Sequence, residues 1–372
     1  MPVRPALRAT LVLLVLSLVP CGAFAAAASP GAHEGDFVVH NAHFASGETL
    51  PELRLHWLTL GTLRRNAEGH AVNAVLVLHG TGGSGRQFLV PQFANELYGP
   101  GQPLDTTQYF VVLPDGIGHG RSSKPSDGLH ARFPHYDYDD MVSAQHRLLV
   151  EGLGVDHLRL VMGTSMGGMQ TWVWGETYPG FMDALMPLAC NTVPIVGRNR
   201  LWRQMIADAI RHDPGWRDGE YASEPLMALR AAEELLIIAG ASPIPMQAQL
   251  STRDSVDRWL TARMDRDLAT LDANDLLYQI ESSRHYDPSA KLASIHVPVT
   301  WVNSSDDFIN PPELGIAERM ARQVRDARFV MIPASERTHG HGTHTWAALW
   351  KDELTDLLER SEPAHLRAMP GE

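Results

Sequence analysis

The sequence predicts an α/β fold built on a mainly parallel sheet with helices on both faces. Short apolar runs bounded by glycine or proline recur along the chain, as in strands that are buried on both faces. Helical patterns separate these runs, and such alternation favours a parallel sheet. The interval 191–290 breaks the alternation, because it has helical patterns and no convincing strand. The chain has 372 residues, 44% of them hydrophobic, which suits one large domain or two ordinary ones.

Seven strands can be identified in chain order, and we expect about eight in the sheet. Residues 53–57 alternate between apolar and polar, which is typical of a strand with one buried face. The other six strands are continuous apolar runs. They are residues 74–78, 109–113, 158–162, 185–190, 297–303 and 328–332.

Helices are expected between and after these strands, at 139–153, 166–178, 312–324 and 344–360. Three further helices, at 201–211, 226–239 and 256–268, fall in the interval without strands. This interval is too long for an ordinary pair of crossover helices, so we expect it to cover the carboxyl edge of the sheet. The predicted organisation is a signal peptide at 1–25, an α/β core at 26–190 and 291–372, and a helical cap at 191–290.

The charge of the chain excludes some classes of partner. The formal net charge is −12, from 31 basic and 43 acidic residues. Such a surface repels nucleic acid and acidic lipid, so neither is an expected partner. The only cysteines are Cys21 and Cys190, which excludes a disulfide framework and a cysteine-based zinc site.

The N-terminus has the pattern of a secretory signal peptide. Arg4 and Arg8 precede the apolar run 11–19, and Ala23-Phe24-Ala25 provides an A-x-A cleavage site. The apolar run is too short for a comfortable membrane span, and an uncleaved anchor is the alternative. We therefore expect cleavage after Ala25, a periplasmic or secreted protein, and no stable membrane anchor after cleavage.

The candidate nucleophile lies in Gly163-Thr164-Ser165-Met166-Gly167. A GxSxG motif alone is a weak signal, but here a predicted strand runs into it and a predicted helix leaves it. In that context Ser165 occupies a strained elbow that lifts its hydroxyl above the sheet edge. Side chains at Gly163 and Gly167 would collide with the adjoining strand and helix. The alternative is a tight turn with a solvent-facing serine.

A nucleophilic serine needs a base and an orienting carboxylate, which in this arrangement follow on loops after later strands. The loop after strand 297–303 contains Asp306 and Asp307. The loop after strand 328–332 contains His339, His341 and His344. These histidines could instead bind a metal, but no further carboxylate or histidine stands nearby at a suitable spacing. We therefore expect no metal and no cofactor.

The oxyanion hole is expected to use the backbone N–H of Met166, the residue after the nucleophile. The second N–H should come from the loop 79–85, and Thr81 is the preferred residue. The glycines of this loop could also indicate a phosphate-binding loop, but no Lys-Ser/Thr pair follows them. No nucleotide site is therefore expected.

Several blocks of the sequence resemble the homoserine O-acetyltransferase-like branch of the α/β-hydrolases. They are GTSMGGMQ (163–170), GPGQPLDTTQYFVV (99–112), AIRHDPGWRDGEY (209–221) and LGTLRRNAEGHAVNAVLVLHG (60–80). The similarity covers nearly all of the chain after the signal peptide. It implies an α/β-hydrolase fold, a helical cap over an active-site tunnel, and a homodimer as one outcome, since capped members are often dimers.

The resemblance also implies which residues form a Ser-His-Asp triad. The nucleophile is Ser165. The family's acid precedes a Pro-Pro-Glu run by four residues, which matches Asp307 before Pro311-Pro312-Glu313 rather than Asp306. The family's Gly-His pair corresponds to Gly340-His341, which distinguishes His341 from its neighbours.

Two departures from the family affect the predicted function. The transferases carry an aspartate directly after the catalytic histidine, whereas this chain has Gly342. They also use acetyl-CoA in the cytoplasm, whereas this chain carries an export signal. We therefore predict an exported serine hydrolase that cleaves small esters or acyl compounds, with water as the usual acceptor. The alternative is an O-acyltransferase that moves an acyl group from acyl-CoA to a small alcohol. A catalytically silent binding protein is disfavoured, because all three triad residues are present.

Overall fold

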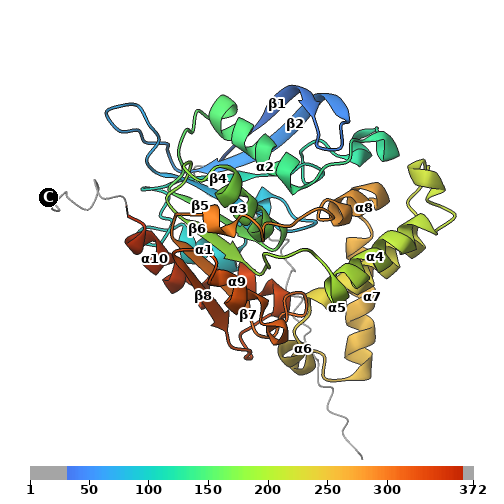
Figure 1. Ribbon diagram of the computed structural model, residues 1–372. Coiled ribbons are helices and arrows are strands. Elements are labelled where there is room, and N and C mark those ends of the chain that lie inside the picture. Colours follow the sequence, from blue (N-terminus) through green and yellow to red (C-terminus); the bar gives the residue numbers. More distant parts are fainter. Residues whose placement is uncertain (1–31, 363–372) are drawn as a thin grey trace, which may run out of the picture. The chain divides into compact units, whose positions relative to one another are not determined.

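The computed structural model describes residues 32–362, so the predicted signal peptide at 1–25 lies outside the described residues. The described chain contains an eight-stranded sheet with the order β1-β2-β4-β3-β5-β6-β7-β8. Strand β2 pairs antiparallel with β1 and β4, and the remaining pairs are parallel (Figure 1). The mainly parallel sheet predicted from the sequence is therefore confirmed. The strands are β1 His33–His43, β2 Thr49–Leu60, β3 Ala74–Leu78, β4 Phe110–Pro114, β5 Leu160–Thr164, β6 Leu185–Leu188, β7 Val299–Ser304 and β8 Ala327–Ile332.

Helices cover both faces of the sheet. Those of the α/β core are α1 Pro91–Leu97, α2 Tyr138–Arg147, α3 Met166–Thr177, α9 Ile316–Ala321 and α10 Lys351–Arg360. Alternate residues of β3 point to opposite faces, so that Leu76 and Leu78 join one apolar cluster and Val75 and Val77 the other. Helices α2, α3 and α9 contribute to the first cluster, and α1 and α10 to the second.

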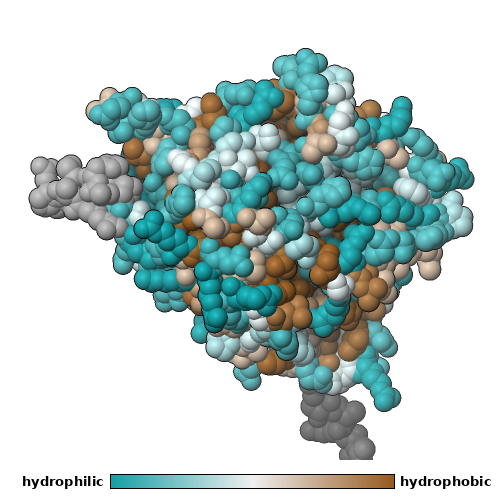
Figure 2. Space-filling model, in the orientation of Figure 1, coloured by the Kyte–Doolittle hydropathy of each residue, from teal (hydrophilic) through white to brown (hydrophobic). Residues whose placement is uncertain are grey.

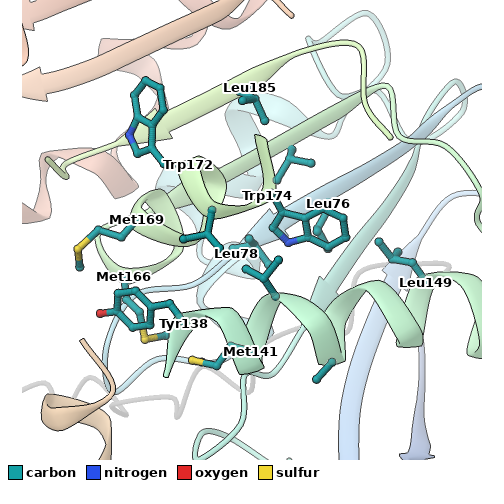
Figure 3. Close-up of a cluster of buried hydrophobic side chains, with 14 of the residues drawn as sticks. Leu76, Leu78, Tyr138, Met141, Leu149, Met166, Met169, Trp172, Trp174 and Leu185 are labelled. Carbon is teal, nitrogen blue, oxygen red and sulfur yellow. The ribbon is translucent and has the colours of Figure 1, made fainter. Parts of the chain in front are cut away.

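The start of α3 packs into the first cluster. Figure 3 shows Met166 of α3 beside Tyr138 and Met141 of α2. All three side chains are almost fully buried, with at most 1% of their surface exposed. The residue that follows the candidate nucleophile is therefore held in the core.

Two of the predicted helices, both beside the candidate site, are shorter than expected. The helix expected at 344–360 begins only at Lys351, because the preceding chain forms 3-10 turns at Gly340–Thr345 and Ala347–Leu349. The helix expected at 312–324 is a 3-10 turn, Pro312–Leu314, followed by α9, because Gly315 at φ +56° separates them. Both changes affect loops that border the candidate site.

Five helices lie between β6 and β7: α4 Gly197–Arg211, α5 Leu226–Gly240, α6 Pro243–Gln249, α7 Arg253–Asp267 and α8 Ala273–Glu281. Helices α4, α5 and α8 share an apolar cluster of their own, which includes Ile206, Ile210, Leu229, Leu277 and Ile280. In Figure 1 these helices lie together on the right, beside the sheet. The boundaries of a cap at 191–290 remain a prediction. Within residues 32–362, no helix is both long enough and apolar enough to cross a membrane.

Candidate active site

Ser165 lies at a sharp turn between β5 and α3. Its backbone has φ 55° and ψ −111°, a conformation that non-glycine residues rarely adopt. A Cβ atom on Gly163 would lie 2.2 Å from the carbonyl oxygen of Gly167, and one on Gly167 would lie 2.0 Å from that of Leu78. Both glycines are therefore required for the close approach of strand, turn and helix.

The structure brings Ser165, His341 and Asp307 into one hydrogen-bonded chain. The Oγ atom of Ser165 is 2.7 Å from Nε2 of His341, and Nδ1 of His341 is 2.9 Å from Oδ2 of Asp307. These side chains come from the turn after β5, the loop after β8 and the loop after β7. They meet because the carboxyl ends of parallel strands lie at the same edge of the sheet.

The carboxylate of Asp307 is buried and fully engaged. It accepts hydrogen bonds from the backbone N–H groups of Ile309 (2.7 Å) and Asn310 (3.2 Å), and from the Asn310 side chain (3.0 Å). Burial alone would raise the pKa of Asp307. The facing His341 and the hydrogen bonds from His341 and Asn310 outweigh this effect, so the net pKa of Asp307 lies below its usual range. Asp307 is therefore ionised and orients the imidazole.

Asp306 does not face the histidine and has different partners. Its Oδ2 atom accepts hydrogen bonds from the hydroxyls of Ser242 (2.6 Å) and Thr338 (2.8 Å) and from the N–H of Gly340 (3.1 Å), while Ser304 bonds to Oδ1. Asp306 thus connects the start of α6 to the loop that carries His341. The residue types alone did not decide which of the two adjacent acids orients the histidine. In the structure Asp307 faces His341 and Asp306 does not.

The two residues predicted for the oxyanion hole belong to two segments that approach Ser165, the start of α3 and the loop after β3. Met166 is the first residue of α3, where backbone N–H groups have no carbonyl partner within the helix. Thr81 shares a cavity wall with Ser165, and the preceding Gly80 would place a Cβ atom only 3.3 Å from that of Ser165. The loop after β3 therefore reaches the nucleophile closely enough to provide a second N–H.

The other two histidines of the loop have separate surroundings. The ring of His339 stacks on Trp346, with 4.0 Å between ring centroids. Burial, together with the nearby His341, lowers the pKa of His344 to about 3. Among residues 32–362, no group of three or more histidine, cysteine, aspartate or glutamate side chains is arranged to hold a metal ion.

Two cavities meet at Ser165. The larger has a volume of about 1170 Å³ and is lined by the segment after β6, the Asp307 loop, and parts of α5 and α6. The smaller, about 690 Å³, contains Thr81, His341 and the inner faces of α4, α5 and α8. A substrate can therefore extend from the nucleophile in two directions.

Arg203 of α4 is a candidate binding residue that the sequence analysis missed. It lies in the walls of both cavities and is 3% exposed. Its guanidinium bonds to the side chains of Asn199 (2.9 Å) and Ser283 (3.2 Å), and it forms no salt bridge with a carboxylate of the described chain. The sequence did contain a signal for its burial, because Arg203 stands at helical spacing with Ile206, Ala207 and Ile210, on the apolar face of α4.

The fold and this site define a class of protein, and comparison with known proteins agrees. Residues 73–339 match the family described as alpha/beta hydrolase fold. Homoserine O-acetyltransferase from Pelobacter propionicus is 32% identical over 338 residues, which cover 80% of this chain and 87% of the relative. A probable acyltransferase from Methanothermobacter thermautotrophicus is 30% identical, covering 80% of this chain and 89% of the relative. The chain therefore belongs to the homoserine O-acetyltransferase-like branch of the α/β-hydrolases, and it is an enzyme of that fold.

Solved structures support the same fold. Esterase E22 has a TM-score of 0.77 at 21% identity and covers 88% of this chain and 100% of its own. Homoserine O-acetyltransferase from Bacillus anthracis has a TM-score of 0.76 at 21% identity and covers 89% and 98%. Hydrolases and transferases thus share this architecture at the same level of similarity, so the fold does not choose between the two reactions.

Proposed function

We propose that this enzyme transfers an acyl group through Ser165 to a small alcohol that carries a carboxylate. The observation that carries the proposal is the buried guanidinium of Arg203, which lines both cavities that meet at Ser165. A buried charge without an opposite charge is costly, so a ligand that supplies a carboxylate there would gain binding energy. Relatives named homoserine O-acetyltransferase add support, because homoserine is a small alcohol with a carboxylate.

The geometry suits acyl transfer in two steps. In the first, Nε2 of His341 takes the hydroxyl proton of Ser165 while Oγ attacks the carbonyl carbon of the donor. The N–H groups of Met166 and Thr81 stabilise the oxyanion, and His341 returns the proton to the leaving group. In the second step, His341 deprotonates the acceptor hydroxyl, which attacks the acyl-Ser165 carbonyl and regenerates the serine. Asp307 orients the imidazole and stabilises its charged form in both steps.

The smaller cavity suits an acceptor of this kind. It contains His341, which must activate the acceptor hydroxyl, together with Arg203 and Glu233. Burial raises the pKa of Glu233 to about 7, and Arg263 lies 3.2 Å from it. Glu233 is thus already paired with Arg263, and the charge that this wall offers to an acceptor is the guanidinium of Arg203, which is complementary to a carboxylate.

Hydrolysis is the second candidate, and Gly342 favours it. In the transferases an aspartate stands at this position, and glycine removes that carboxylate from beside His341. Water would then take the place of the acceptor alcohol, and His341 would deprotonate it in the same way. The similarity in fold to esterase E22 is compatible with this reaction.

The two reactions differ in what removes the acyl group from Ser165. The enzyme would be acylated with p-nitrophenyl acetate, and the decay of acyl-Ser165 would be followed by intact-mass spectrometry. We expect homoserine to accelerate decay at least tenfold more than 3-amino-1-propanol, which lacks only the carboxylate. In Arg203→Gln this preference should disappear. Decay that is equally fast in water alone and with either alcohol would support the hydrolase instead.

A further inference from the structure

The larger cavity at Ser165 has a mostly apolar inner wall. Side chains from four segments contribute to it: Met169, Val193, Ile195, Met246 and Ile316. At about 1170 Å³, it exceeds the usual range for small-molecule sites, roughly 300–1,000 Å³. An acetyl group would fill only a small part of this volume.

The charged residues in the same wall are engaged or lie at the rim. Asp307 faces His341, and Asp306 accepts hydrogen bonds from neighbouring loops. The guanidinium of Arg198 lies over the Phe308 ring, 3.8 Å from its centroid, and donates to the Phe308 carbonyl (2.6 Å). Glu313 and Arg319 are exposed. Apart from Arg203, which also lines the smaller cavity, the interior therefore offers apolar contact rather than free charge to a ligand.

Reaction geometry determines which part of a substrate enters this cavity. The leaving oxygen must lie beside His341, which protonates it, and the carbonyl oxygen must lie beside Met166 and Thr81. His341 and Thr81 line the smaller cavity and are not among the residues of the larger one. The remaining substituent of the carbonyl carbon is the acyl chain, and the direction left for it is the larger cavity.

The rim of the cavity is also apolar. Val196, Ile238 and Leu314 line the cavity and are 68%, 64% and 57% exposed. Figure 2 shows apolar surface gathered in the lower centre of the view, where α5, α6 and α9 lie in Figure 1. A chain longer than the inner wall would therefore continue along apolar surface instead of meeting water at once.

We propose that the larger cavity binds the acyl group of the substrate, and that this group is an apolar chain of about six or more carbons rather than acetyl. The inference rests on the acyl-serine chemistry proposed above and holds for either acceptor. Each methylene buried in such a wall is expected to raise kcat/KM roughly three- to fourfold until the cavity is filled.

The test is a series of p-nitrophenyl esters from acetate to decanoate, which share one leaving group and differ only in the acyl chain. The burst of p-nitrophenolate reports acylation of Ser165. We expect kcat/KM for octanoate to exceed that for acetate at least thirtyfold. A flat or falling series, with Ser165 still acylated by acetate, would overturn the acyl-chain inference and leave the proposed function standing. Failure of every ester to acylate Ser165 would overturn both.

Variants test whether the preference depends on this cavity. Val193→Trp narrows the inner wall, and Ile238→Asp places a charge at the exposed rim, where it does not threaten folding. Each should lower the octanoate-to-acetate ratio at least tenfold. Leu271→Trp is the matched control, because Leu271 lines only the smaller of the two cavities that meet at Ser165, and it should keep the ratio within twofold. An unchanged ratio in both Val193→Trp and Ile238→Asp would show that the chain binds elsewhere.

Discussion

Ser165 keeps its strained backbone because neighbouring elements hold it from two sides. Its N–H donates to the carbonyl of Leu188 in β6 (2.9 Å), and its own carbonyl accepts from the N–H of Met169 in α3 (3.0 Å). Strain of this kind costs on the order of 1–3 kcal/mol and persists only where the surroundings over-determine it. Here it directs the hydroxyl towards His341.

Substitution of the three hydrogen-bonded residues should remove most of the activity. Ser165→Ala or His341→Ala should each lower kcat by roughly 10⁴- to 10⁶-fold, and Asp307→Ala by somewhat less. The double variant Ser165→Ala/His341→Ala should lose little more than either single one, because these residues act as a unit. Ester turnover measured by stopped assay would check these values.

Asp306→Ala is the control for the choice of acid. Asp306 has no contact with the imidazole, so its loss should cost far less turnover than loss of Asp307. Inactivation by Asp306→Ala with an active Asp307→Ala would show that the acid is assigned wrongly.

Buried histidines should make the protein sensitive to acid. Burial, together with the nearby His79, lowers the pKa of His119 to about 3, whereas the unfolded-state pKa is near 6.5. Below pH 6.5 the unfolded chain binds the proton that the folded chain excludes, so stability falls as pH drops from 6.5 towards 3. At pH 5 the loss from His119 is about 2 kcal/mol.

Thermal unfolding at pH 8 and pH 5 would check this effect. The decrease in stability between these values should be about 2 kcal/mol smaller in His119→Phe than in the wild type. His43→Phe, at an exposed position of β1, is the matched control and should keep the wild-type decrease. An identical decrease in all three proteins would exclude His119 as a source of acid sensitivity.

At the scale of elements, one polar contact joins the helical segment to the loop that bears the base. The Ser242 hydroxyl at the start of α6 bonds to Asp306, and Asp306 bonds to Gly340 beside His341. Gly340 has φ +59°, and a Cβ atom there would lie 2.7 Å from the carbonyl oxygen of Ala241. The helical segment and the His341 loop are therefore in direct contact, and their positions are coupled.

Removal of this contact should loosen the helical segment more than it impairs the chemistry. Ser242→Ala leaves Asp306 with its other donors, so we expect a loss of about 1–3 kcal/mol in stability and less than a tenfold loss in kcat. Amide hydrogen exchange should accelerate around α5 and α6. Ser251→Ala, at an exposed serine of the same segment, should change none of these quantities. Unchanged exchange in Ser242→Ala would contradict the coupling.

The elements that could be predicted from the sequence are those whose local pattern matches their burial. Strand β3 is a continuous apolar run because both of its faces are covered, and all five residues are buried. Strand β1 was missed, because as an edge strand it is mostly exposed and carries no such pattern. The final helix was predicted to begin too early, because His344 and Trp346 form turns that position the His341 loop.

The candidate site was predictable to a similar degree and for similar reasons. Ser165 could be found because a strand, a GxSxG turn and a helix are contiguous in the sequence. Residue type alone could not distinguish Asp307 from Asp306 as the acid of the triad, since only the packing of the loop after β7 determines which one faces His341. Arg203 was missed because its pairing depends on residues about 80 positions away, such as Ser283.

At the scale of the whole molecule, charge and location together restrict the acyl donor. The chain has a formal net charge of −12, which offers no general attraction to a donor with several phosphate groups. If the protein is exported, it is also removed from the cytoplasmic pool of acyl-CoA. An uncharged ester with an apolar acyl chain would avoid both obstacles and would suit the larger cavity.

We propose that the protein is exported and that residues 1–25 are removed, and this proposal gives the last prediction. Arg4, Arg8, the apolar run and Ala23-Phe24-Ala25 have the order that a signal peptidase recognises. Expressed from its full sequence in a bacterial host, the protein should be recovered outside the cytoplasm with Ala26 as its first residue, as measured by intact mass. Ala25→Glu should block cleavage and leave the uncut chain at the membrane, because the peptidase requires a small residue there. Recovery of the uncut wild-type chain from the cytoplasm would contradict export, and acyl-CoA would then become an accessible donor.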